Sequence, residues 1–66
     1  MQITVNGDAR TVDDATTVAD LVQRFNLTPE RVAVEVNERL VRRVQYGETR
    51  LGAGDRVEIV TLVGGG

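Results

Sequence analysis

Residues 54–66 read GDRVEIVTLVGGG, and this stretch contains the most apolar strand-like run of the chain. The Gly-Asp pair near its start predicts a turn. In the run that follows, the odd-numbered Val57 and Ile59 are expected to point into the core. Val60 and Leu62 then fall on the opposite face, where a sheet covered on one side usually presents polar residues. The stretch therefore predicts a last strand with two apolar side chains on its solvent face.

The N-terminal segment MQITVNGDARTV, residues 1–12, predicts a β-hairpin. Ile3 and Val5 alternate with polar residues, and the Asn-Gly pair after them favours a two-residue type I′ turn. Such a turn pairs Ile3 with Arg10, which places a charged residue on the inner face beside Val12. Either the stem of Arg10 extends along the rim of the core, or the turn is longer and contains a bulge. The sequence leaves both arrangements open.

The segment TTVADLVQRFNL, residues 16–27, predicts one helix. Its apolar residues recur at i, i+3, i+4 and i+7 and so share one face. They are Val18, Leu21, Val22 and Phe25. Thr17 and Asp20 resemble a capping box at the N-terminal end. At the other end, Asn26 can take the left-handed position that follows a helix, and Leu27 can then fold back on the last turn.

The segment RVAVEVNERLV, residues 31–41, predicts a second pair of strands joined by a turn at Asn37 and Glu38. The element order is therefore β-β-α-β-β-β. A right-handed crossover through the helix places the later strands in the same sheet as the first hairpin, with the last strand parallel to the first in the middle. This is an α+β fold of the β-grasp (ubiquitin-like) type, a mixed sheet of four to five strands with one helix packed on one face. We expect the domain to span residues 1–63, with a flexible glycine tail over residues 64–66.

The inventory of side chains argues against a self-contained enzyme. The 66 residues include no Cys, His, Ser, Lys or Trp. Ser, Cys and Lys are among the main nucleophiles of proteins, and His is the most frequent near-neutral base. The ten acidic residues are scattered and are typical of a solvated face. The net charge is −2 and the arginines are spread along the chain, which predicts no nucleic-acid surface.

The same inventory bears on location. No apolar run approaches the roughly 20 residues that span a bilayer, and no signal peptide is evident. We therefore expect a cytoplasmic protein with no membrane contact, monomeric when free, that binds no metal or cofactor of its own.

Since the side chains offer few groups for catalysis, the terminal carboxylate of Gly66 becomes the candidate reactive group. A carboxylate must be activated before it can acylate anything, and adenylation by ATP allows it to accept an amine, a thiol or sulfide. An activating enzyme must shield the adenylate from water, so the tail has to be threaded into it. Gly64 and Gly65 suit threading because glycine has no Cβ and adopts any bend. The candidate docking residues before the glycines are Val60, Leu62 and Val63.

Four segments, TVNG near the start, TTVADLV on the helix, RVAVEVN on the third strand and GDRVEIVTLVGGG at the end, resemble the ThiS-type sulfur carriers of thiamine biosynthesis. The resemblance covers nearly the whole chain. It implies that a ThiF-type adenylyltransferase would adenylate Gly66, using ATP and Mg²⁺ that the partner holds. Sulfur from a cysteine-derived persulfide would then leave a thiocarboxylate on Gly66, and thiazole synthase would accept that sulfur. In this scheme the chain is a protein co-substrate.

Two positions depart from the family pattern. This chain has Val41-Arg42-Arg43 where the family often has Val-Pro-Arg, and Glu38 where it often has glycine.

Other functions stay open at this stage. They are a sulfur carrier for molybdopterin or tRNA thiolation, a ubiquitin-like modifier joined to lysines through Gly66, and an interaction module with a frayed tail.

Overall fold

The computed structural model describes residues 1–62, so the expected boundary between residues 63 and 64 lies outside the described residues. The described part contains five strands, one α-helix and two short 3-10 helices. In chain order they are β1 (Gln2–Val5), β2 (Asp8–Thr11), α1 (Val18–Arg24), η1 (Pro29–Arg31), β3 (Val32–Val36), β4 (Arg39–Val41), η2 (Arg43–Gln45) and β5 (Arg56–Thr61). Over residues 1–62, none of the helices has the length and apolar character that crossing a membrane requires.

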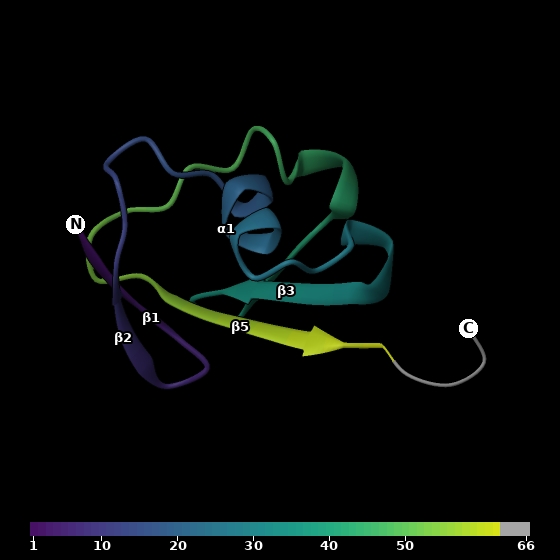
Figure 1. The fold of residues 1–66 in the computed structure, drawn as a ribbon, viewed down its shortest axis with the longest axis horizontal. Coiled ribbons are helices and arrows are strands. Elements are labelled where there is room, and N and C mark those ends of the chain that lie inside the picture. The colour runs from purple at the N-terminus through teal and green to yellow at the C-terminus, as the bar shows by residue number, and fades with distance from the viewer. Residues whose placement is uncertain (63–66) are drawn as a thin grey trace.

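The strands form one mixed sheet in the order β2-β1-β5-β3-β4, and α1 lies across one face of it (Figure 1). β5 runs parallel to β1 and antiparallel to β3. The last strand therefore occupies the centre of the sheet. This arrangement confirms the β-grasp fold expected from the element order.

The core lies between α1 and the sheet. The side chains of α1 that face the sheet are at most 1% exposed; they are Val18, Leu21 and Val22. Tyr46 and Leu51, from the irregular segment after β4, join the same buried cluster and close one side of it. Full burial of an aliphatic side chain contributes roughly 1.5–3 kcal/mol. Packing of this kind stabilises α1, because a helix of 7 residues is too short to be stable alone.

The N-terminal hairpin has the two-residue turn that the Asn-Gly pair predicts. Asn6 and Gly7 have φ angles of 52° and 87°, both left-handed as a type I′ turn requires, and the register pairs Ile3 with Arg10 without a bulge. Arg10 is exposed, and its guanidinium carbon lies 5.2 Å from the centroid of the Phe25 ring. Of the two arrangements that the sequence leaves open, the first is therefore correct, and a cation–π contact accompanies it.

Both ends of α1 have the caps that the sequence predicts. The hydroxyl of Thr17 accepts a hydrogen bond from the N–H of Asp20 (3.1 Å), and the Asp20 carboxylate accepts one from the N–H of Thr17 (3.0 Å). After the helix, Asn26 has a φ of 58°, and the N–H of Leu27 donates to the carbonyl oxygen of Val22 (3.1 Å). This is a Schellman motif, and it sets the direction in which the chain leaves the helix.

Candidate functional site at the end of the central strand

β5 leads to the tail, and a side-chain amide extends its pairing with the first hairpin. The N–H of Asn6 donates to the carbonyl oxygen of Val57 (2.8 Å). The side chain of Asn6 then donates through Nδ2 to the carbonyl oxygen of Ile59 (3.1 Å) and accepts through Oδ1 from the N–H of Ile59 (2.8 Å). The carboxamide thus takes the place of a further peptide group of β1 after the backbone has turned away.

A second asparagine fixes the start of β5. Asn37, with a φ of 53°, donates its N–H to the carbonyl oxygen of Arg56 (2.7 Å), and its Oδ1 accepts from the N–H of Arg56 (2.9 Å). Its Nδ2 donates to the Asp55 carboxylate (3.0 Å), which also accepts from the N–H of Gly52 (2.7 Å). Asparagines in two different turns therefore hold β5 from opposite sides.

Near its end, β5 continues along β3. Thr61 pairs with Val32, and the N–H of Leu62 donates to the carbonyl oxygen of Arg31 (2.7 Å). The last described residue thus still runs beside the start of β3, which sets the place from which the tail emerges. The other tail residues named from the sequence, Val63, Gly64, Gly65 and Gly66, lie outside the described residues. Their threading and their terminal chemistry stay predictions.

The face of the sheet opposite α1 presents exposed apolar side chains beside this exit. Val60 is 60% exposed and Leu62 is 56% exposed, as the alternation along β5 predicts. Val60 pairs with Ala33 on β3. Leu40 on β4 is 68% exposed and, by its pairing with Glu35, lies on the same face. The exposure of Val60 and Leu62 is therefore as expected, and a docking role for them stays a prediction.

Two carboxylates on this face lie directly opposite each other. Glu35 on β3 pairs with Glu58 on β5, and like charges in such cross-strand pairs destabilise a sheet. Neither forms an ion pair with another residue of the described part, where the salt bridges are Met1 with Asp14 and Arg56 with Glu38. The outer face therefore combines apolar side chains with negative charge that is open to a positively charged partner.

Other chemistry is sparse in the described residues. Residues 1–62 contain no group of three or more His, Cys, Asp or Glu that could hold a metal ion. Burial raises the pKa of the Tyr46 phenol, against a smaller lowering by Arg43. The Tyr46 hydroxyl lies 3.5 Å from the carbonyl oxygen of Val32, on the core side of the sheet, so it supports packing rather than a reaction.

Comparison with known proteins decides the family. The ThiS family model matches residues 3–66. The chain belongs to the ThiS family. The match spans nearly the whole chain, and it confirms the resemblance found in the four sequence segments.

Individual ThiS-family relatives agree with this assignment. The sulfur carrier protein ThiS of Bacillus subtilis is 36% identical over 63 residues, which cover 94% of this chain and 96% of that protein. The crystal structure of a thiamine biosynthesis protein, ThiS, from Geobacter metallireducens has a TM-score of 0.84 and 35% identity, and the match covers 100% of both chains. A protein of Magnetococcus marinus named thiazole synthase is 38% identical over 66 residues, and the chain spans only 20% of its length.

Proposed function

We propose that the chain is a sulfur carrier whose Gly66 is adenylated and converted to a thiocarboxylate that supplies sulfur for thiazole formation in thiamine biosynthesis. The observation that carries the proposal is the fixed central strand of a ThiS-family domain, which leads directly into Val63 and the three glycines. Hydrogen bonds hold this strand on both sides as far as Ile59 and on the β3 side as far as Leu62. The rigid domain can therefore present the tail to a partner at a defined place.

In the proposed scheme, sulfur reaches the carboxylate of Gly66 in three steps. A carboxylate oxygen of Gly66 attacks the α-phosphorus of ATP, and pyrophosphate leaves with the Mg²⁺ that the partner supplies. The terminal sulfur of a persulfide then attacks the acyl carbon and displaces AMP, which gives an acyl disulfide. A thiol cleaves this disulfide, takes the donor sulfur into a new disulfide, and leaves the thiocarboxylate on Gly66. The partner holds ATP and Mg²⁺, so the chain is a co-substrate in each step.

The described residues support a docking role for the outer face of the sheet. Val60 and Leu62 offer exposed apolar area next to the exit of the tail, and Glu35 and Glu58 offer negative charge on the same face. Charge complementarity chiefly steers and orients the encounter with a partner. A ThiF-type adenylyltransferase that docks here would bear apolar residues beside a basic group. Val63, which follows Leu62 in the sequence, is a further candidate docking residue.

Thiazole synthase is the acceptor that the relatives favour. Two proteins with this name, from Magnetococcus marinus and Paramagnetospirillum magneticum, match the chain over all its 66 residues and over 20% of their own length. In each of them a segment similar to this chain belongs to a polypeptide named for the acceptor reaction. This similarity supports the thiazole branch over other sulfur acceptors.

Intact mass spectrometry tests the proposal. The protein is incubated with ATP, Mg²⁺, a ThiF-type adenylyltransferase and a persulfide donor with a thiol. The expected product is heavier than the starting chain by the difference between one sulfur and one oxygen atom. A variant that lacks Gly65 and Gly66 should stay unmodified and melt at the same temperature as the parent. An unchanged mass of the parent refutes carriage of sulfur, and attachment of the chain to lysines of other proteins would instead indicate a modifier.

A further inference from the structure

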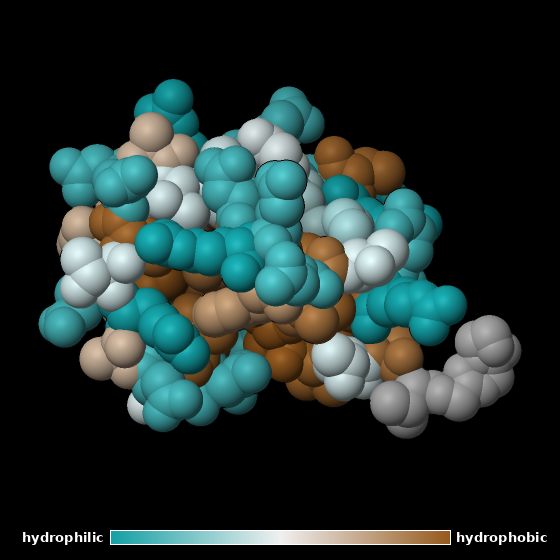
Figure 2. All heavy atoms as spheres, viewed as in Figure 1, coloured by the Kyte–Doolittle hydropathy of each residue, from teal (hydrophilic) through white to brown (hydrophobic). Residues whose placement is uncertain are grey.

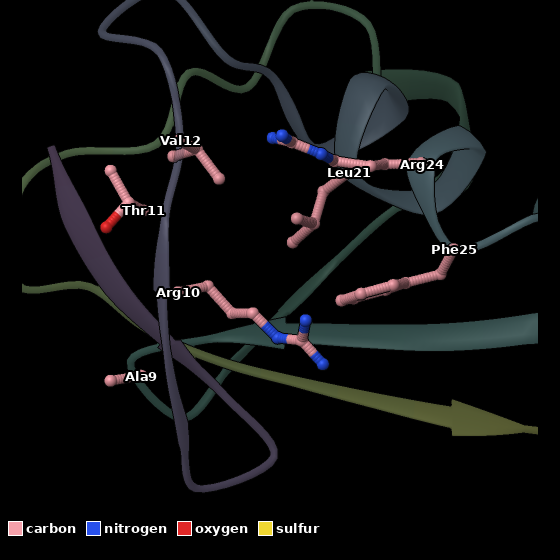
Figure 3. Close-up of a pocket in the computed structure, with 7 residues that line it drawn as sticks. All are labelled: Ala9, Arg10, Thr11, Val12, Leu21, Arg24 and Phe25. Atoms are coloured by element: carbon pink, nitrogen blue, oxygen red, sulfur yellow. The ribbon is translucent and has the colours of Figure 1, made fainter.

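A hollow of about 390 Å³ lies between the edge strand β2 and helix α1, away from the outer face of the sheet. Two arginines line it, one from each element (Figure 3). Arg10 points from β2 toward Phe25, and Arg24 extends from α1 in the direction of Val12. Leu21 and Phe25 supply the apolar part of the lining. Figure 2 shows hydrophobic surface in a recess of this part of the molecule, flanked by hydrophilic groups.

The charge of this hollow differs from that of the whole chain. The net charge of the chain is −2, yet no acidic residue lines the hollow. Within residues 1–62, Arg10 and Arg24 take part in neither of the two salt bridges. Asp8 precedes Arg10 on the same face of β2 and lines the adjoining hollow toward the turn. On the other side of Arg24, Asp13 and Asp20 line a neighbouring hollow. The positive charge is therefore confined to the hollow between Arg10 and Arg24, where it can receive carboxylates.

The backbone of β2 is open along the same hollow. In a two-residue hairpin the hydrogen-bonded pairs alternate with non-bonded pairs, and here the bonded pairs are Val5 with Asp8 and Ile3 with Arg10. The next bonded pair follows the same alternation, because the N–H of Val12 donates to the carbonyl oxygen of Met1 (2.9 Å). The residues in between are Ala9 and Thr11, so their peptide groups point away from β1. Both residues line the hollow, and β2 is an edge strand of the sheet.

We propose that this hollow binds an extended segment of a partner protein, which adds to the sheet as a sixth strand beside β2. Its backbone pairs with the peptide groups of Ala9 and Thr11. Its side chains on the helix side alternate between an apolar residue over Leu21 and Phe25 and carboxylates that meet Arg10 and Arg24. Charge complementarity selects an acidic segment over a neutral or basic one. A short strand with charged side chains also resists unselective edge pairing, which makes recognition depend on the matching charges.

This surface is separate from the exit of the tail. In Figure 1, β2 lies at the left of the molecule and β5 ends at the right. An acidic segment bound at β2 therefore leaves the outer face and the end of β5 accessible. The chain can thus hold one partner at the hollow while another partner acts at the tail, and this inference is independent of the sulfur chemistry.

The probe is the capped peptide acetyl-TETVTET-amide, which places a valine between two glutamates on one face of a strand. We expect saturable changes in the amide NMR shifts of Ala9 and Thr11 and in the side-chain Nε signals of Arg10 and Arg24. The matched peptide with glutamine in place of glutamate should bind more weakly. Arg10→Gln and Arg24→Gln should each raise the Kd by up to about fivefold, as for exposed ion pairs.

Arg39→Gln is the control, since Arg39 is an exposed arginine on β4 at the opposite edge of the sheet. It should leave the Kd unchanged. The proposal is overturned if the glutamine peptide binds as tightly as the glutamate peptide, or if Arg39→Gln weakens binding as much as Arg10→Gln and Arg24→Gln do. It is also overturned if the peptide causes no saturable shift at Ala9 and Thr11. A titration with sodium acetate separates carboxylate binding from strand pairing. If acetate shifts the signals of Arg10 and Arg24 while the peptide leaves those of Ala9 and Thr11 unchanged, the hollow is an anion site and strand addition is refuted.

Discussion

Replacement of Asn6 by glycine tests whether a side-chain amide holds the central strand. The change removes two hydrogen bonds, of 3.1 and 2.8 Å, to the backbone of Ile59. Each such bond contributes a net 0.5–1.5 kcal/mol or so, which gives a loss of about 1–3 kcal/mol. Glycine relieves the positive φ of 52° but loses more entropy on folding. These two effects oppose each other, so the lost hydrogen bonds should dominate.

Thermal unfolding followed by circular dichroism measures this loss. For a domain of this size, 1 kcal/mol corresponds to a change in Tm of about 4–8 °C, so the variant should melt about 5–20 °C lower. Asn26→Gly is the matched control. Asn26 has a similar φ of 58°, and it is exposed in the turn after α1, outside the side-chain hydrogen bonds of residues 1–62. The control should melt at or above the parent temperature.

Hydrogen exchange locates the effect. The Ile59 amide should exchange faster in Asn6→Gly than global unfolding explains, because its acceptor is removed. If Asn6→Gly and Asn26→Gly melt alike and Ile59 stays protected, the reasoning about the amide is refuted. The parent pairing of β5 with β1 would then be sufficient to hold the strand.

Three other changes have defined outcomes. Glu38→Gly should raise the free energy of unfolding by about 0.5–1 kcal/mol, since Glu38 has a φ of 68° that a Cβ disfavours; in denaturant melts, no gain would contradict this. Glu58→Gln should stabilise the sheet by about 0.2–1 kcal/mol and slow adenylation by the partner enzyme at low salt. An unchanged rate of adenylation would show that the charge of Glu58 takes no part in docking. Above about pH 10, the parent should lose up to about 1.4 kcal/mol of stability per pH unit, and Tyr46→Phe should abolish this loss in urea melts at each pH.

The sign of the Tyr46 prediction follows from its environment. Burial raises the pKa of the folded phenol above the ordinary tyrosine value of about 10, so the unfolded chain loses the proton first as pH rises. The stability that Tyr46 contributes is therefore complete below about pH 10 and is lost progressively up to the folded pKa. The chain has no lysine and one tyrosine, so no other side chain is expected to titrate in this window. A slope that persists in the Tyr46→Phe variant would contradict the assignment.

Local signals predicted the turns and caps of this fold well, because the relevant contacts lie close in sequence. Asn6 with Gly7, and Thr17 with Asp20, act on neighbours within a few residues, and the structure confirms both. The central position of β5 followed from the handedness of the crossover. These inferences needed no knowledge of long-range side-chain contacts.

Long-range contacts could not be predicted in the same way. The side-chain hydrogen bonds of Asn6 reach a residue 53 positions away. The Asn-Gly turn already accounts for an asparagine at this position, so the sequence does not indicate these hydrogen bonds. The contact of Arg10 with Phe25 and the hollow beside it depend on how β2 approaches α1, which alternation does not encode. Sequence did indicate the exposed apolar residues before the tail, because the period of a strand fixes which face each side chain takes.

Two departures from local rules distinguish function from strain in this small domain. The Glu35–Glu58 pair opposes stability on the face that presents Val60 and Leu62 next to the tail. Glu38 opposes stability through its backbone angle in the turn between β3 and β4. Proteins break such rules where function requires it, so the two cases should separate in a combined measurement. Glu58→Gln should gain stability and lose speed with the adenylating partner, whereas Glu38→Gly should gain stability and keep that speed. If both variants kept full speed, the opposed carboxylates would be strain as well, and the docking face would rest on its apolar residues alone.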